Sequence, residues 1–248
     1  MQIRSAAKWI AAAAGILVGA VIVGFTLKDT TYIEAKLEQI KGARQSVTAV
    51  EKTTAKTQKI KNAEIVKETP LPESSCISDF AFMPELPTGC EITSLTMTLN
   101  YYGYSADKMA MALEYLPTVG WTNTYYGDNE TLYGNDIYNY FIGNPQSETD
   151  GLSCGAGAIV TAADGYLADN GNAMKAEDET GSEPEQLYRF VSEGTPVVVW
   201  GTIGMEERQI MESWNTEDGR EASWAMNDHC VVLIGYSADS VTVADPIE

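Results

Sequence analysis

The hydrophobic pattern begins with an uncharged run over residues 9–27, which Arg4 and Lys8 precede and Lys28 follows. A helix that crosses a bilayer core needs about 20 such residues, whereas a cleaved signal peptide has an apolar core of about 7 to 15. We therefore predict a transmembrane signal anchor over 9–27, after a short flank of residues 1–8. A cleaved signal peptide and a buried soluble helix are the alternatives. Basic residues after the run favour a cytoplasmic location for the rest of the chain. The position of the run near the N-terminus favours an extracytoplasmic location instead.

Residues 28–75 combine a weak helical pattern with a polar tail. Apolar residues between Ile33 and Val47 keep a helix-like spacing, and residues 51–75 are mostly Lys, Thr and Glu with two prolines. This pattern predicts a stalk, in which a short helix or weak coiled coil is followed by a solvated tether.

A capping pattern and apolar periodicity predict a helix that begins near Thr88. Glu91 follows Thr88 by three residues, and apolar positions from Ile92 recur at helical spacing until Gly103. Cys90 then lies in the first turn, where unpaired amides and the helix dipole favour an anion. We expect its thiol to lose its proton more readily than a free cysteine does. The alternative is a small apolar residue that fills a gap.

From residue 76 onward, helical patterns come first and strand patterns later. Helices are predicted over 107–115, 157–170 and 183–194, surface loops over 120–153, and strands over 196–201, 229–236 and 241–246. Elements that segregate in this way predict an α+β domain over residues 76–248.

Charge divides the chain into a basic leader and an acidic body. Residues 1–70 carry eleven Lys or Arg and six Asp or Glu, whereas the rest carries five and twenty-nine, within a total of −19. Because such a body repels phosphate backbones and anionic lipid headgroups, we expect no nucleic-acid partner. A cationic peptide or wall polymer suits it better, although acidity can also simply keep an exported protein soluble.

The content of ligating residues argues against a metal or cofactor. The chain has four cysteines without a Cys-x-x-Cys pair, one histidine, and no glycine-rich phosphate loop. The acidic residues of the loop-rich stretch lack the spacing of a calcium loop. We therefore expect no metal and no cofactor. Disulfides remain open, because sequence does not decide their pairing.

His229, the sole histidine, begins one predicted strand, and Asp245 ends the next. If a three-residue turn joins these strands, Asp245 lies opposite His229 or one diagonal step away, whereas a slip of one residue separates their faces. His229 would then take the proton of Cys90, Asp245 would orient the ring, and the thiolate would attack a carbonyl. The separation of Cys90 and His229, about 140 positions, falls within the range of about 130 to 150 found in papain-like peptidases. A structural histidine is the alternative.

Six segments carry a resemblance to a known family. They are ELPTGCE at 85–91, NYYG at 100–103, GNP at 143–145, TPVVVW at 195–200, DHCVVLIGY at 228–236 and ADP at 244–246. Together they resemble the bacterial papain-like domains related to the bacteriocin-leader-processing cysteine peptidases, peptidase family C-thirty-nine-like, over nearly all of residues 76–248. The resemblance implies a papain-like fold in which an N-terminal helix with the cysteine packs on an antiparallel sheet with the histidine and aspartate. It implies that Cys90, His229 and Asp245 are the catalytic residues.

The chain departs from the family pattern in two places. Family members commonly carry a glutamine shortly before the cysteine, as part of the oxyanion hole, where this chain has Phe82, Met83 and Pro84. Relatives also continue into further sheet beyond the position of Glu248, so we expect a fragment or an incomplete sheet. The transporter portion of the leader-processing enzymes is not visible, so their substrate is not implied.

These observations predict an extracytoplasmic cysteine peptidase or amidase, held at the membrane through residues 9–27 or secreted. Its substrate would be a peptide or a cell-wall peptide, cleaved through an acyl-thioester on Cys90. The alternative is a catalytically inactive papain-like module that binds peptides or cell-wall components, which the missing glutamine favours. Transfer to an amine acceptor would use the same residues as hydrolysis.

Overall fold

The computed structural model describes residues 7–10, 20–25, 70–120, 125–127, 131–171 and 174–247. Its contacts divide the chain into one unit of Met1–Phe25 with Leu71–Glu248 and a second unit, Thr26–Pro70. Apart from Pro70, the second unit lies outside the described residues, so the stalk predicted over 28–75 stays a prediction.

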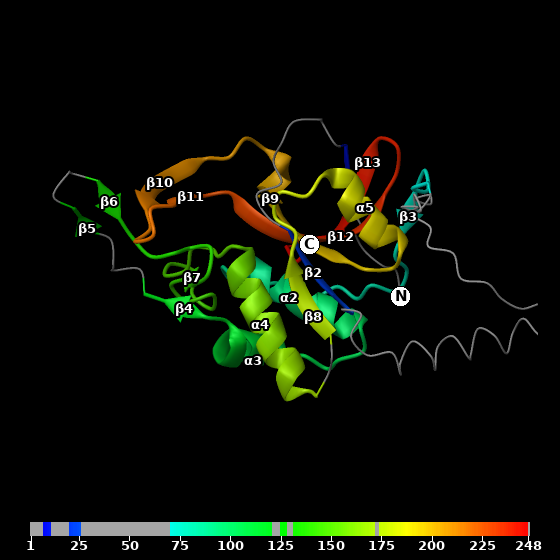
Figure 1. Cartoon of the computed structure of the whole chain (residues 1–248), viewed down its shortest axis with the longest axis horizontal. Coiled ribbons are helices and arrows are strands. Elements are labelled where there is room, and N and C mark those ends of the chain that lie inside the picture. The colour runs from blue at the N-terminus through cyan, green and yellow to red at the C-terminus, as the bar shows by residue number, and fades with distance from the viewer. Residues whose placement is uncertain are drawn as a thin grey trace, which may run out of the picture. The chain divides into compact units, whose positions relative to one another are not determined.

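The larger unit is built on an antiparallel sheet of seven strands (Figure 1). Its path runs β1-β13-β12-β9-β2-β8, and β3 also pairs with β12. The strands are β1 (Ala7–Ile10), β2 (Ala20–Phe25), β3 (Ser75–Cys76), β8 (Met174–Asp178), β9 (Val197–Thr202), β12 (Asp228–Tyr236) and β13 (Ser240–Ala244). The β-branched runs of β9 and β12 lie at the centre, where all residues of β12 after Asp228 are buried.

The helices cover this sheet on both faces. They are α2 (Cys90–Tyr101), α3 (Lys108–Ala110), the π-helix η1 (Met111–Tyr115), α4 (Ala156–Asp169), α5 (Pro184–Ser192) and the short 3₁₀ helix η3 (Ile203–Met205). α2 packs on β12 and β9, α4 packs on β8 and β2, and α5 packs on β12 and β3. Figure 1 shows α5 on the side of the sheet away from α2 and α4. The mixed α+β class and the antiparallel sheet are as predicted.

α2 is more deeply buried than an amphipathic helix, because all ten residues from Cys90 to Leu99 are buried. Three threonine hydroxyls inside it donate to the carbonyl one turn earlier, as Thr96 Oγ1 does to Ile92 O at 2.7 Å. Ser94 Oγ instead donates to Cys230 O at 3.2 Å and so ties α2 to β12. Gly103, with φ of +91°, follows the helix end as predicted.

The hairpin of β12 and β13 contains a register shift that the sequence did not predict. Tyr236 pairs with Val241, but Leu233 pairs with Val243, so one extra residue, Ile234, is inserted on β12. The pairing of Val232 with Ala244 then leads Asp245 toward Val231, on the face of His229 and one diagonal step from it. The diagonal arrangement is thus reached through a bulge, while three residues, 237–239, join the two strands.

Smaller sheets lie in the stretch that was predicted as loops and beyond it. β4 (Thr118–Val119) pairs with β7 (Phe141–Ile142), and a four-stranded sheet has the order β11-β10-β6-β5. Its strands are β5 (Tyr125–Tyr126), β6 (Leu132–Tyr133), β10 (Ile210–Asn215) and β11 (Glu221–Ala225), and Figure 1 shows it beside the larger sheet.

The expected membrane segment, 9–27, falls largely outside the described residues. Its described parts belong to β1 and β2, which pair with β13 and with β8 and β9. Within the described part of the chain, no helix has the length and apolar character needed to cross a bilayer. The signal anchor stays a prediction.

Candidate active site

Cys90 is the first residue of α2 and so lies in its first turn, as the sequence predicted, but the capping box is absent. The residue before it, Gly89, is the N-cap and provides no side-chain bond. Thr88 Oγ1 donates to the carbonyls of Asn144 and Ser147 instead, at 3.3 and 3.2 Å. The predicted capping role of Thr88 is therefore wrong, because its hydroxyl fastens the 143–150 loop to the turn before Cys90.

Glu91 is also buried rather than used as a cap, with 2% of its surface exposed. Its Oε1 accepts hydrogen bonds from Ser153 Oγ at 2.6 Å and from the Cys154 amide at 3.1 Å. Burial raises the pKa of Glu91, and these two bonds oppose the rise. The side chain thus holds the 153–154 segment against the start of α2.

His229 and Asp245 form a buried pair. Nε2 of His229 lies 2.8 Å from Oδ1 of Asp245, and that oxygen also accepts the Ile247 amide at 2.9 Å. Burial opposes ionisation of Asp245, but the bonds from His229 and Ile247 outweigh it and lower the pKa of the carboxyl. Because an ionised carboxylate only accepts hydrogen bonds, Nε2 carries the proton and Nδ1 is left as the acceptor.

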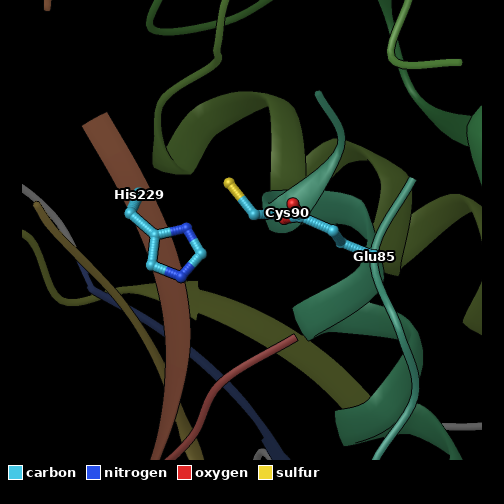
Figure 2. A group of neighbouring side chains, drawn as sticks. All are labelled: Glu85, Cys90 and His229. Carbon is cyan, nitrogen blue, oxygen red and sulfur yellow. The ribbon is translucent and has the colours of Figure 1, made fainter. Parts of the chain in front are cut away.

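The thiol of Cys90 lies beside this pair, and a second carboxyl joins it. One ligating atom each of Glu85, Cys90 and His229 lies within 4.8 Å of the other two. Figure 2 shows the Cys90 sulfur on the side of Cys90 that faces His229. Glu85, from the segment before α2, extends toward Cys90. Thiol, imidazole and carboxyl are also donors that a divalent metal can use; the expectation of no metal stays untested.

The electrostatics of Cys90 differ from the sequence-based expectation. Burial raises the pKa of the Cys90 thiol well above its ordinary value, and Glu91, Cys230 and Glu85 raise it further. A backbone hydrogen bond from Cys230 opposes them. The expected ready loss of the proton is therefore wrong for the resting site, because desolvation and nearby carboxyl groups outweigh the helix end. All four cysteines are free thiols.

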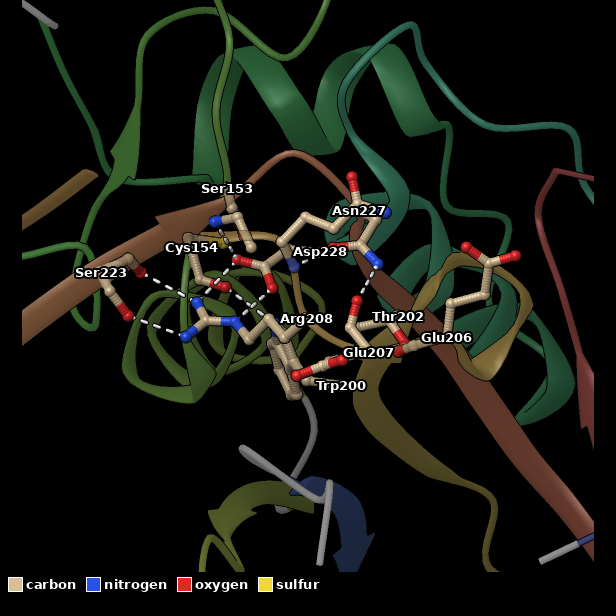
Figure 3. A network of polar contacts seen from close by, with 12 residues as sticks. Ser153, Cys154, Trp200, Thr202, Glu206, Glu207, Arg208, Ser223, Asn227 and Asp228 are labelled. Atoms are coloured by element: carbon tan, nitrogen blue, oxygen red, sulfur yellow. Dashed lines mark hydrogen bonds and ion pairs between the residues drawn. The ribbon is translucent and has the colours of Figure 1, made fainter. Parts of the chain in front are cut away.

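A polar network fixes the start of β12, the strand that carries His229 (Figure 3). The Arg208 guanidinium donates two hydrogen bonds to the Asp228 carboxylate, from Nε to Oδ1 at 2.7 Å and from Nη2 to Oδ2 at 2.8 Å. Its Nη1 and Nη2 also donate to Oγ and O of Ser223, at 2.7 and 3.0 Å. The fork holds Asp228, the residue before His229, against the β11 strand.

A cavity of about 530 Å³ adjoins these residues. It is lined by Cys154, Trp200, Arg208 and Asp228, among others. Trp200 Nε1 donates to Cys154 O at 2.8 Å across its wall, so the indole is held in place (Figure 3). The cavity thus reaches the 153–154 segment that binds Glu91 and the first residue of β12, but neither Cys90 nor His229 lines it.

Sequence reasoning did not single out Glu85 or Arg208. Glu85 stands in the segment 85–91 that carries the resemblance, five residues before Cys90, but its closeness to the thiol depends on the fold. Arg208 lies in a polar stretch without apolar periodicity, so the sequence offers no signal for its fork with Asp228.

A model of the Peptidase_C39 like family matches residues 75–248, which is more than half of the chain. The chain belongs to this family. The family recognised from the sequence segments is therefore confirmed.

This C39-like chain is also similar to a solved structure and to a curated protein. A crystal structure of a candidate C39-like peptidase from Bacillus anthracis superposes with a TM-score of 0.59, at 35% identity, over 71% of this chain and 84% of that one. An uncharacterized protein, YvpB of Bacillus subtilis, is 31% identical over 163 residues, which are 66% of this chain and 60% of YvpB. The match to a C39-like structure, together with the mixed helices and sheet, confirms the predicted papain-like fold class.

Proposed function

We propose that this C39-like protein is an extracytoplasmic cysteine peptidase that hydrolyses peptide bonds through a thioester on Cys90. The observation that carries the proposal is one cluster in which the Cys90 thiol lies within 4.8 Å of His229, whose other side is bonded to Asp245 at 2.8 Å. A nucleophile, a base and an orienting acid in this order are what acyl transfer by a thiol requires.

In this mechanism Asp245 keeps the proton of His229 on Nε2, so that Nδ1 can accept the proton of Cys90. The sulfur then adds to the carbonyl carbon of the peptide, and the carbonyl oxygen becomes an oxyanion. Collapse of this intermediate breaks the C–N bond, and His229 gives its proton to the leaving amine. Water, deprotonated by His229, finally adds to the thioester and releases the acid and the free thiol.

The raised pKa of the thiol fits a neutral resting pair. Proton transfer from Cys90 to His229 then accompanies attack on the substrate rather than preceding it. The first amide of α2, that of Cys90, has no carbonyl partner within the helix, and in this mechanism it donates one hydrogen bond to the oxyanion.

The N-terminal apolar run and the acidic body support the proposed location and substrate. A signal anchor or signal peptide at residues 9–27 would carry the domain across the membrane. The acidic body of residues 71–248 favours peptides with positive charge.

One observation favours a second function, a binding module without catalysis. Cys90 is 8% exposed and its thiol pKa is raised, and both features lower the reactivity of a thiol. In that case the cavity would hold a peptide without cleaving it.

Cleavage of a mixed peptide library separates these functions. The full chain is incubated with the library, and new amino termini are identified by mass spectrometry, with Cys90→Ser as the matched control. Peptidase activity predicts new termini that are absent with Cys90→Ser, and amide products on addition of glycinamide would indicate transfer instead. An unchanged library that still binds the protein would overturn hydrolysis in favour of the binding module.

A further inference from the structure

The segment before α2 holds Glu85 rigidly beside the reacting sulfur. The Glu85 amide donates to Pro246 O at 3.0 Å, which anchors it to the residue after Asp245. Lys108 Nζ donates to the carbonyls of Pro84 and Glu85, at 2.6 and 3.4 Å. The backbone is thus fixed from two sides, by the end of β13 and by α3, while the carboxyl lies within 4.8 Å of the Cys90 sulfur.

The charges that face Glu85 favour its neutral form. Burial raises the pKa of this carboxyl, Asp245 and Glu91 raise it further, and His229 and Lys108 lower it, with a net rise. The pKa of Glu85 is thus set by burial and by neighbouring charges. Within the described part of the chain, the Glu85 carboxyl makes no hydrogen bond. The carboxyl therefore keeps its proton to a higher pH than a free glutamic acid does, and in its protonated form it can donate a hydrogen bond.

Acyl transfer on Cys90 needs a donor in this position. The negative oxygen that forms on the attacked carbon is stabilised by hydrogen bonds, and the Cys90 amide at the start of α2 supplies one. The Glu85 carboxyl, which lies within 4.8 Å of the Cys90 sulfur, is close enough to the attacked carbon to supply a second. A carboxylate cannot donate, but a carboxylic acid in an apolar site can.

We propose that Glu85, as the neutral carboxylic acid, is the second hydrogen-bond donor to the oxyanion formed when Cys90 is acylated. This inference rests on the proposed thioester chemistry. As the S–C bond forms and the C=O π bond opens, the Cys90 proton passes to His229 while the Glu85 proton stays on its carboxyl and bonds the new oxyanion. When the leaving group departs, the carbonyl re-forms and this bond weakens again.

The proposal has a definite pH dependence. The donor exists only below the pKa of Glu85, so oxyanion stabilisation is lost as the pH rises through that value. Replacement by Gln supplies an N–H that does not titrate, and replacement by Ala supplies no donor.

Two reagents isolate this effect on the same sulfur. Iodoacetamide alkylates a thiolate by displacing iodide and forms no oxyanion, whereas p-nitrophenyl acetate acetylates it through a tetrahedral oxyanion. Alkylation of Cys90 is followed by site-resolved mass spectrometry, with the exposed Cys76 of the same chain as a reference thiol. Acylation is followed as p-nitrophenolate release, taken as the difference from Cys90→Ser. The ratio of acylation to alkylation rate then reports oxyanion stabilisation.

We expect Glu85→Ala to lower this ratio by about 10²-fold, with alkylation of Cys90 little affected. Glu85→Gln is expected to recover most of the loss and to remove the fall of the ratio at rising pH that the wild type shows. An equal ratio in wild type and Glu85→Ala, or a pH profile that Glu85→Gln leaves unchanged, would overturn the role of Glu85. A Cys90 that neither reagent modifies in a His229-dependent way would instead overturn the proposed function.

Discussion

Nε2 of His229 lies 2.8 Å from Oδ1 of Asp245, although His229 lies in β12 and Asp245 directly follows β13, the other strand of the hairpin. Continuing the pairing of Tyr236 with Val241 would put Asp245 opposite Val232, on the face away from His229. The extra residue on β12 shifts the register by one position, so that Asp245 lies opposite Val231, on the face of His229. A β-bulge is therefore what allows the acid to reach the base.

The lowered pKa of Asp245 predicts a pH-dependent contribution to stability. A carboxyl whose pKa is lower in the folded chain stabilises the fold above its unfolded pKa of about 3.9, and this stabilisation is lost as the pH falls through the folded pKa. We expect Asp245→Asn to cost about 1 kcal/mol at pH 6 and less at pH 3. Urea unfolding at both pH values measures the difference. A cost that is the same at both would contradict the electrostatic origin.

Glu91 raises the pKa of Cys90, so its neutral isostere should do the opposite. Glu91→Gln removes a buried charge while keeping an acceptor for Ser153 and Cys154. We expect alkylation of Cys90 to shift to lower pH. The matched control is Glu114→Gln, on the exposed face of η1, which should leave the profile in place. An unshifted profile in Glu91→Gln would contradict a contribution of Glu91 to the thiol pKa.

The loop that clamps the turn before Cys90 leaves no space at Gly151. A Cβ there would collide with Thr88 Oγ1 and would lie 2.6 Å from Asn144 O, so the loop must shift. We expect Gly151→Ala to destabilise the protein by about 1–3 kcal/mol and to slow Cys90 alkylation. Gly120→Ala is the control, because nothing lies within 4 Å of its added Cβ. Equal thermal unfolding of the two variants would contradict the clamp.

The fork of Arg208 on Asp228 predicts that charge alone does not suffice at this position. Lys keeps the charge but cannot make the paired bonds to Asp228 and Ser223. We therefore expect Arg208→Lys to cost about 2 kcal/mol of unfolding free energy. Chemical denaturation of wild type and Arg208→Lys measures this cost. A loss below the error of measurement would mean that the fork does not order the start of β12.

The sequence predicted the elements whose patterns are local. The helix α2 and the strands β9, β12 and β13 follow from apolar periodicity and β-branched runs, which are local patterns, although the capping box predicted at the start of α2 is absent. The family segments 85–91 and 228–236 added the papain-like fold, which periodicity alone did not specify.

What the sequence did not predict depends on contacts between distant segments. The bulge at Ile234 and the burial of Glu91 under the 153–154 segment arise only when the sheet and α2 pack together. The same packing reverses the expected pKa shift of Cys90, because desolvation is a property of the assembled core. The closeness of Glu85 to the thiol has the same origin.

The central claim is that His229 activates Cys90, and the rate of Cys90 alkylation by iodoacetamide across pH tests it most directly. Site-resolved mass spectrometry of the full chain compares wild type with His229→Ala, with exposed Cys76 as the reference thiol and buried Cys154 as the unreactive one. We predict that Cys90 reacts faster than Cys154 at neutral pH and that His229→Ala slows it by about 10²-fold, while Cys76 stays unchanged. An equal rate of Cys90 alkylation in wild type and His229→Ala would contradict this claim.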